Sequence, residues 1–308
     1  MDFFSINPLN NKKNKSFKFH TEDQITKKIQ LSLKSQEKWK AISLSKRVLS
    51  LRMLLVILDK NKIKYAKMMA LEMGKPIEQG LDEIEKCIWL CDFYFKNALS
   101  FLKNKKVNFD NNRSIVTFQP LGLILGIMPW NFPFWQVFRF SIPVLLSGNT
   151  AILKHSLFVP SCASLIEQIF SKLDTPKNIY QNIRLSNENT NDLIKNPYIS
   201  AVSFTGSTKG GMSVAQTAGS ALKKVLLELG GNDPYLVFSD ARLDNAVQSC
   251  IEGRLLNAGQ SCISAKRIIV VDEIYEQFVE KIIRKLEQKT MGDPTVGVDI
   301  GPLVSAEA

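Results

Sequence analysis

Histidine is nearly absent from this sequence. The chain of 308 residues contains two histidines, His20 and His155, and neither sits in a context typical of a nucleophile–histidine pair. Histidine is the residue that most often acts as a general acid or base in enzymes. If the protein is an enzyme that needs a base, we therefore expect a carboxylate to supply it.

Cysteine is also sparse and shows no pairing pattern. The five cysteines are scattered and odd in number, which does not indicate a disulfide framework: Cys87, Cys91, Cys162, Cys250 and Cys262. Cys87 and Cys91 are four residues apart on an expected helix, a spacing that places two metal ligands on one face. No other cysteine or histidine lies near them in the sequence. We interpret them as small apolar residues on a buried stripe and predict no metal site.

The sequence lacks a long apolar run. Stretches such as 121–130 are too short to cross a bilayer and are interrupted by glycine and proline. Residues 1–8 lack the basic segment and apolar core of a signal peptide. The content of 45% hydrophobic and 22% charged residues is ordinary for a globular protein, and the length suffices for two domains. We expect a cytoplasmic protein without a membrane partner.

Acidic residues are fewer than basic ones, which gives a formal net charge of +11. The lysines are dispersed except at 11–15, where we expect a flexible tail, and at 103–106, where we expect a helix end. No motif interleaves aromatic and basic residues, so we do not expect a nucleic-acid partner. A basic protein that binds nucleic acid or a membrane stays open as an alternative. The same positive field would favour an anionic cofactor or substrate.

The spacing of apolar residues divides the chain into a helical first part and a mixed remainder. Helices are expected over 21–35, 46–60, 62–73 and 78–102, with a stop at Gly74 and Pro76. Expected strands follow at 114–118, 122–127, 150–154, 199–204, 225–228, 234–238 and 266–271. Expected helices between them cover 133–146, 160–173, 206–221, 243–256 and 273–288. This alternation predicts an α/β fold with an open parallel sheet and helices on both faces.

The pattern starts again after two adjacent glycines, Gly230 and Gly231. We therefore assign residues 1–230 to a first domain with N-terminal helices and residues 231–308 to a second domain. Within the first domain, residues 107–120 are candidate bridging or oligomerisation strands.

Three side chains in separate motifs have the chemistry needed to act on a carbonyl compound. Asn131 lies in the segment Met-Pro-Trp-Asn-Phe-Pro, Glu228 ends an apolar strand, and Cys262 ends the segment Asn-Ala-Gly-Gln-Ser-Cys. A thiol attacks a carbonyl carbon, an amide stabilises the oxyanion that forms, and a carboxylate activates water. Simpler interpretations are a turn asparagine and a small buried thiol. Glu228 is either exposed at the end of its strand or buried with a raised pKa, and the buried alternative suits a general base.

A glycine turn lies in residues 204–211, between an expected strand and an expected helix. Backbone N–H groups at the start of a helix favour phosphate groups. The spacing differs from the G-x-G-x-x-G pattern, so the turn alone is equally consistent with a plain connection. Lys154, at the end of a buried strand, is either a ligand of ribose hydroxyls or an ordinary solvated lysine.

These motifs, in this order, resemble the aldehyde dehydrogenase superfamily, and are most similar to its NAD(P)-dependent succinic semialdehyde dehydrogenases. The resemblance implies a Rossmann-type cofactor domain followed by an α/β catalytic domain, with a small aldehyde as substrate. It implies that Cys262 forms a hemithioacetal and then a thioester. Glu228 would act as general base for the water that hydrolyses this thioester. Asn131 and the backbone N–H of Cys262 would hold the oxyanion.

The resemblance also assigns residues to the cofactor, which would be NAD or NADP. The implied cofactor-binding residues are Trp130, Lys154, Ser156, Gly206, Ser207, Gly211 and Leu229. Leu157 stands where NAD-preferring members often carry an acid, so NADP should be tolerated. Arg139 matches an arginine that binds the distal carboxylate of the substrate. Leu256 stands where some relatives carry a second arginine, and Arg254 lies two residues earlier.

The family normally continues by roughly half of this length again. We therefore expect the chain to be truncated at its C-terminus, with an incomplete second domain whose apolar faces are exposed. The resemblance implies homo-oligomers formed through a C-terminal strand, which we expect this sequence to lack. A nucleotide-binding remnant without turnover is the alternative to a working enzyme.

Overall fold

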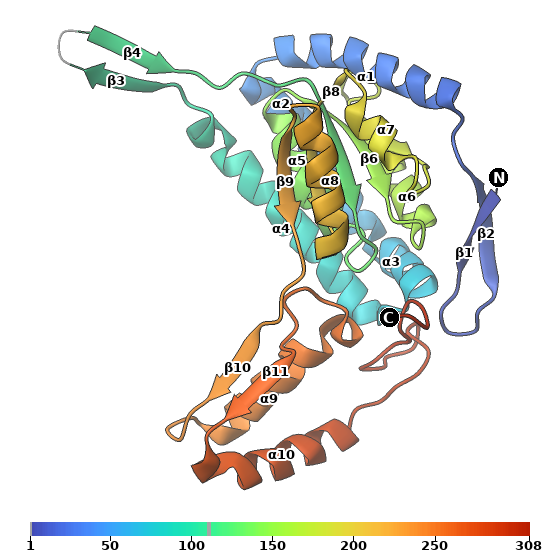
Figure 1. The fold of residues 1–308 in the computed structure, drawn as a ribbon, viewed down its shortest axis with the longest axis vertical. Coiled ribbons are helices and arrows are strands. Elements are labelled where there is room, and N and C mark those ends of the chain that lie inside the picture. The colour runs from blue at the N-terminus through green and yellow to red at the C-terminus, as the bar shows by residue number, and fades with distance from the viewer. Residues whose placement is uncertain (1, 110–111) are drawn as a thin grey trace.

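The computed structural model describes residues 2–109 and 112–308. Its centre is a five-stranded parallel sheet in the order β7-β6-β5-β8-β9 (Figure 1). The strands are β5 (Leu123–Met128), β6 (Thr150–His155), β7 (Tyr180–Ile183), β8 (Ile199–Thr205) and β9 (Lys224–Glu228). The chain moves from β5 to one edge and then crosses back to β8. The carboxyl ends of β5 and β8 therefore form the topological switch point at which open α/β sheets bind ligands.

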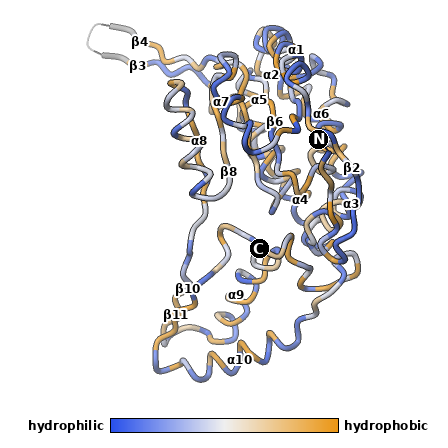
Figure 2. The backbone as a smooth tube through the Cα atoms, turned by 45° about the vertical axis from the view of Figure 1, so that its right-hand side comes forward, coloured by the Kyte–Doolittle hydropathy of each residue, from blue (hydrophilic) through white to orange (hydrophobic). Residues whose placement is uncertain are grey.

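Helices cover both faces of this sheet, as the sequence predicts. The alternating side chains of β5 separate two cores, since Leu123 and Leu125 belong to one cluster and Ile124 and Met128 to the other. The first cluster lies under α1 (Glu22–Ala41), α7 (Thr190–Lys195) and α8 (Thr208–Ser220). The second lies under α2 (Leu44–Leu51), α3 (Met53–Met73), α4 (Ile77–Phe101), α5 (Trp135–Leu146) and α6 (Pro160–Ser171). Figure 2 shows apolar residues along the central strands.

The long helices α3 and α4 form a hairpin, and α3 ends at the predicted stop. Gly74 caps α3 in a left-handed conformation, with φ of 75°. The boundary expected near residue 61 is wrong, because α3 begins at Met53. Asn61 does not interrupt the helix because its amide donates to the carbonyl of Ile57 one turn earlier.

Segment 11–15, which was expected to lie in a flexible tail, belongs instead to a hairpin formed within residues 2–18. Strands β1 (Asp2–Ile6) and β2 (Lys13–Lys18) form an antiparallel hairpin. Asn7 and Asn11 build its turn, since Asn11 has a φ of 56° and its N–H donates to the carbonyl of Asn7. The ring of Phe3 stacks on that of Phe17 at 5.7 Å between centroids. The expectation of a flexible tail was wrong, because the stacking of Phe3 on Phe17 stabilises a hairpin in spite of the lysines.

A second hairpin projects from the body of the molecule (Figure 1). It consists of β3 (Lys105–Phe109) and β4 (Asn112–Val116), which pair antiparallel. These strands overlap the candidate bridging segment 107–120, of which residues 110 and 111 lie outside the described part of the chain. The exposed apolar side chains on the hairpin include Val107 and Ile115.

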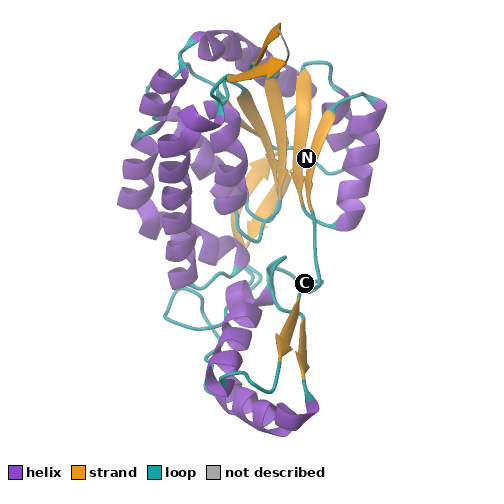
Figure 3. Ribbon diagram, turned by 90° about the vertical axis from the view of Figure 1, so that its left-hand side faces the viewer, coloured by secondary structure: helices purple, strands orange, loops and turns teal. Residues whose placement is uncertain are grey.

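The second unit is small. Parallel strands β10 (Pro234–Val237) and β11 (Arg267–Val270) pack on α9 (Leu243–Leu255) and α10 (Tyr275–Glu287), as Figure 3 shows. Its cluster of buried residues, as far as the structure describes it, is Val237, Val247, Cys250, Ile251 and Phe278. Leu236 and Ile269 are exposed on the pair of strands, as expected. None of the helices within the described ranges is long and apolar enough to cross a membrane.

Candidate active site

A cavity of about 470 Å³ lies at the carboxyl ends of β5, β8 and β9. It brings together Asn131, Glu228 and Cys262, which are separated in the sequence by up to 131 residues. Four of the expected cofactor residues also line it: Trp130, Gly206, Ser207 and Leu229. The cavity therefore joins the switch point of the sheet to the nucleophile segment of the second unit.

Asn131 lies on the loop between β5 and α5 and is bonded to the segment that carries Cys262. Its side-chain Nδ2 donates to the carbonyl of Gln260 at 2.9 Å. Its own carbonyl accepts from Nδ2 of Asn257 at 2.8 Å. An amide nitrogen carries two hydrogens, so one N–H of Asn131 remains after the bond to Gln260.

The nucleophile segment turns sharply before Cys262. Asn257, Ala258 and Gly259 are all left-handed, with φ values of 55°, 55° and 76°. Such a conformation is costly for residues with a side chain and persists only where the surroundings hold it. Asn257 is 1% exposed, and its backbone N–H donates to Oε1 of Gln79 at 2.7 Å. The turn presents Cys262 to the cavity.

Cys262 differs from the other cysteines in its exposure. Its thiol is exposed, whereas Cys87, Cys91, Cys162 and Cys250 are buried. Burial raises the pKa of the Cys87, Cys91 and Cys162 thiols. Buried thiols of this kind stay protonated and unreactive, and Cys262 is the exposed thiol among the five. The interpretation of Cys262 as a small buried thiol is wrong.

Glu228 is exposed and paired with a cation. It follows Leu227 at the end of β9, opposite Thr205 of β8. Its carboxylate accepts from Nη2 of Arg139 at 2.8 Å, with side-chain exposures of 47% for Glu228 and 35% for Arg139. Of the two alternatives for this carboxylate, the structure favours the exposed one. Arg139 itself lies on α5 and lines a neighbouring apolar groove of about 290 Å³ rather than the main cavity.

The glycine turn leads from β8 into α8, as expected for a phosphate site. The N–H of Gly206 donates to the carbonyl of Glu228 at 3.0 Å, and the Ser207 hydroxyl accepts from the N–H of Gly210 at 3.1 Å as helix cap. Gly211 lies one turn into α8 and does not line the cavity. A Cβ on Gly211 would meet Cδ2 of Leu229 at 2.5 Å, so this glycine permits α8 to pack closely on Leu229.

Lys154 and Ser156 lie at the carboxyl end of β6, on the same edge of the sheet but outside the cavity lining. Lys154 is 5% exposed and donates to Oδ1 of Asn187. Burial lowers the pKa of Lys154 to about 8. The interpretation as an ordinary solvated lysine is therefore wrong. Asn187 was not predicted, since it follows β7 in a stretch without a motif.

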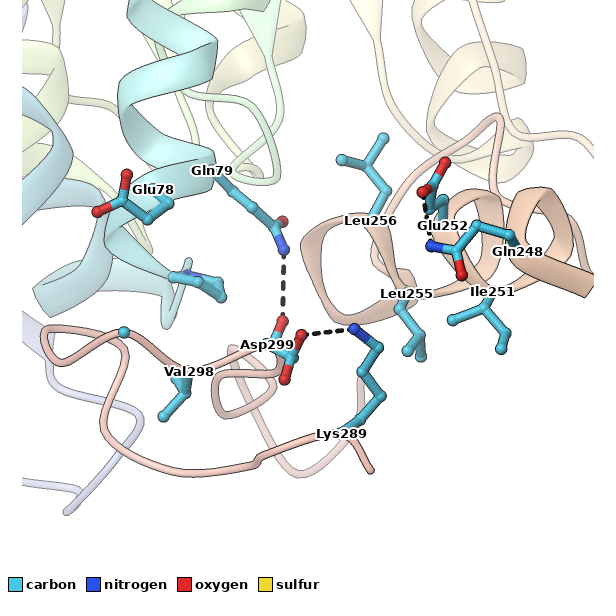
Figure 4. Close-up of a pocket in the computed structure, with 12 residues that line it drawn as sticks. Glu78, Gln79, Gln248, Ile251, Glu252, Leu255, Leu256, Lys289, Val298 and Asp299 are labelled. Atoms are coloured by element: carbon cyan, nitrogen blue, oxygen red, sulfur yellow. Dashed lines mark hydrogen bonds and ion pairs between the residues drawn. The ribbon is translucent and has the colours of Figure 1, made fainter. Parts of the chain in front are cut away.

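Two cations line the cavity together with Cys262. They are Arg254, whose guanidinium donates to the Ser264 hydroxyl at 3.2 Å, and Lys266. Leu256 faces a different pocket, of about 450 Å³, which Figure 4 shows between α4 and α9. Sequence reasoning noted Arg254 only as a neighbour of Leu256 and missed Lys266, which carries no motif.

Comparison with known proteins gives a consistent result. A family model described as "Aldehyde dehydrogenase family" matches residues 2–308. A protein of Synechocystis named "Probable succinate-semialdehyde dehydrogenase (NADP(+))" is 37% identical over the whole chain, which covers 68% of that relative. The Escherichia coli "Succinate semialdehyde dehydrogenase (NAD(P)+) Sad" is 38% identical over 94% of the chain and is covered to 63%.

Solved structures show the same relationship. The succinic semialdehyde dehydrogenase of Streptococcus pyogenes, crystallised in complex with NADP+, superimposes with a TM-score of 0.96 at 31% identity. The alignment covers 99% of this chain and 68% of that one. The chain thus spans 63–68% of the length of these relatives.

Proposed function

Because the chain belongs to the aldehyde dehydrogenase family, we propose that it oxidises a small aldehyde to the carboxylate with NADP or NAD as hydride acceptor. The observation that carries this proposal is the convergence of Cys262, Asn131 and Glu228 on one cavity at the switch point. Thiol, amide and carboxylate there supply a nucleophile, an oxyanion donor and a base.

The three groups act in turn on one aldehyde molecule. The Cys262 thiolate adds to the aldehyde carbon, and the electron pair of the carbonyl moves to oxygen, where an N–H of Asn131 stabilises it. A bound nicotinamide cofactor supplies the acceptor for the hydride that then leaves this carbon. Glu228 takes a proton from water as the water attacks the resulting thioester, and the thiolate leaves with the release of the carboxylate.

The residues present fit a dinucleotide. The start of α8 at Ser207 directs backbone N–H groups toward the switch point and favours a phosphate. Lys154 offers a buried ammonium at the end of the neighbouring strand, and Leu157 places no carboxylate there to repel a phosphate. We propose that Trp130, Ser156, Gly206 and Leu229 complete this site, with Gly211 acting through the packing of α8.

We propose succinic semialdehyde as the substrate, since both curated relatives described above carry that name. Arg139 would bind the distal carboxylate. In the structure Arg139 is paired with Glu228. The substrate would therefore replace one carboxylate with another on the same guanidinium and release Glu228 for its role as base.

The test is reduction of NADP and NAD by the purified chain with succinic semialdehyde and with butanal, an uncharged aldehyde of equal length. We expect turnover, abolished by Cys262→Ala. We expect Arg139→Gln to lower the preference for succinic semialdehyde over butanal by about tenfold or more, while Arg139→Lys loses less. Arg254→Gln is the comparison, because Arg254 lines the cavity of Cys262 and Arg139 does not; a larger loss of preference in Arg254→Gln than in Arg139→Gln would contradict the role of Arg139. NADP binding without reduction of either aldehyde would instead favour a nucleotide-binding remnant.

A further inference from the structure

The first two turns of α4 contact both segments that carry the proposed oxyanion donors. Gln79 and Glu83 are four residues apart and therefore lie on the same face of the helix. Glu83 forms hydrogen bonds with the loop of Asn131, which belongs to the larger unit, the one with the five-stranded sheet. Gln79 forms a hydrogen bond with the loop of Cys262, which belongs to the smaller unit, the one with β10 and β11. One helix face thus spans the junction at which the cavity is formed.

Glu83 fixes the end of the Asn131 loop. Its Oε1 accepts from the backbone N–H groups of Phe134 at 2.8 Å and Trp135 at 2.9 Å, at the start of α5. A carboxylate at this end of a helix is stabilised by the helix dipole. The Glu83 carboxylate is buried and paired with the buried ammonium of Lys75. That ammonium lies 3.9 Å from the ring centre of Phe132, the residue after Asn131.

Gln79 bonds the Cys262 loop at the first of its three left-handed residues. Its Oε1 accepts from the N–H of Asn257, the first of the three left-handed residues. Its Nε2 donates to the carbonyl of Asp299 at 3.4 Å, the contact drawn in Figure 4. Asn257 in turn donates from Nδ2 to the carbonyls of Asn131 at 2.8 Å and Gln260 at 3.3 Å. These bonds connect Gln79 to both loops through one asparagine.

We propose that Gln79 and Glu83 are positioning residues that set the separation of the Asn131 amide and the Cys262 backbone N–H. This inference rests on the proposed function for the identity of the two donors, but the alignment itself is a property of the fold. Oxyanion stabilisation requires donors at hydrogen-bond distance from one point, and a displacement of about 1 Å costs on the order of a hundredfold in rate. Neither residue lines the cavity that holds Cys262.

The experiment is hydrogen exchange on the whole chain, read at segments 129–136 and 255–264. Gln79→Ala removes the acceptor of the Asn257 N–H and should speed exchange in 255–264 by about five- to tenfold. Gln79→Glu keeps an oxygen in that place and should restore most of the protection. Glu72→Gln is the matched control, because Glu72 is a buried carboxylate that caps α6 at Ser161 and Cys162. It should speed exchange only around α6.

Measurement of kcat and KM separates a positioning role from a general effect on stability. Gln79→Ala and Glu83→Gln should lower kcat by about tenfold or more and leave KM for NADP within about twofold. Unchanged exchange in 255–264 in Gln79→Ala would overturn the proposal. Faster exchange spread equally through β5 to β9 would also overturn it, because the role would then be general stability. If the wild-type chain reduces no cofactor but Gln79→Ala changes exchange as expected, the proposed function fails and the positioning role stands.

Discussion

Lys154 is a buried cation at the carboxyl edge of the sheet, where we propose that the cofactor binds. Desolvation disfavours its charged form, which is why its pKa falls to about 8. Asn187 provides a neutral partner, which orients the ammonium but does not offset its charge. A polyanionic ligand would restore the charged form. The affinity of the proposed site should therefore depend on pH in the alkaline range.

We expect the Kd for NADP to rise by roughly tenfold between about pH 7 and about pH 9 as Lys154 loses its proton. Isothermal titration calorimetry at several pH values measures this. Lys154→Met should bind weakly at all of them, with a flat profile. Lys223→Met is the matched control, since burial also lowers the pKa of Lys223 but its ammonium bonds the carbonyls of Ile194 and Asn196. The same slope in Lys154→Met would contradict the assignment.

Single residues were predictable where a motif surrounds them. Cys262, Glu228 and Asn131 each lie in a segment with its own pattern, and the structure brings all three to one cavity. The pairing of Arg139 with Glu228 was not predictable, because it depends on where α5 crosses the end of β9. Spacing along one helix says which residues share a face, but not what faces them.

His155 connects the loop after β5 to the end of β6 by hydrogen bonds. Its Nε2 donates to the carbonyl of Pro133 at 3.0 Å, and its Nδ1 accepts from the N–H of Ser156 at 2.9 Å. The neutral ring therefore joins the loop after β5 to the end of β6. Burial lowers the pKa of His155 to about 4, although its bond to Pro133 acts in the opposite direction.

The contribution of His155 to the free energy of unfolding should fall in acid. Between pH 6.5 and about 4 the unfolded chain binds a proton at this histidine and the folded one does not, so stability falls as pH falls. His155 should contribute a loss of about 2 kcal/mol between about pH 7 and about pH 5. Over the same pH range, the free energy of unfolding of His155→Gln should fall by about 2 kcal/mol less than that of the wild-type chain. Urea unfolding followed by tryptophan fluorescence measures it, and an equal pH dependence in both proteins would contradict the account.

Elements were predictable where apolar spacing and stops agree. Between β5 and α10, all strands and helices except β7 and α7 were expected, and they follow the expected ranges within a few residues, because alternating strands and helices show a clear change of period. The β1–β2 hairpin was not predicted, since its lysine-rich second strand is mostly exposed. Short elements such as β7 and α7 carry too few residues to show a period.

The two units of the molecule differ in how much apolar surface they bury. The larger unit encloses two clusters around a five-stranded sheet. The smaller unit has one small cluster and a pair of strands with exposed Leu236 and Ile269. Stability scales with buried apolar area, so the two units should open at different free energies. All four tryptophans lie in the larger unit, which makes their fluorescence specific to it.

We expect backbone hydrogen exchange in β10, α9 and β11 to be at least about tenfold faster than in β5, β6 and β8. Limited proteolysis should cleave first within residues 232–308 and release a fragment that keeps the tryptophan fluorescence of the intact chain. NADP should protect the larger unit more than the smaller one, because its proposed contacts lie there. Uniform protection across both units would show that they open together.

If Cys262, Asn131 and Glu228 act on one aldehyde as proposed, an intermediate on Cys262 can be trapped. Glu228→Gln keeps the shape of the side chain but removes the base, so the thioester on Cys262 should form and persist. After mixing with succinic semialdehyde and NADP, peptide mass spectrometry should find one substrate acyl group on Cys262, and none in Cys262→Ala. A Glu228→Gln protein that binds NADP yet carries no adduct on Cys262 would contradict the account.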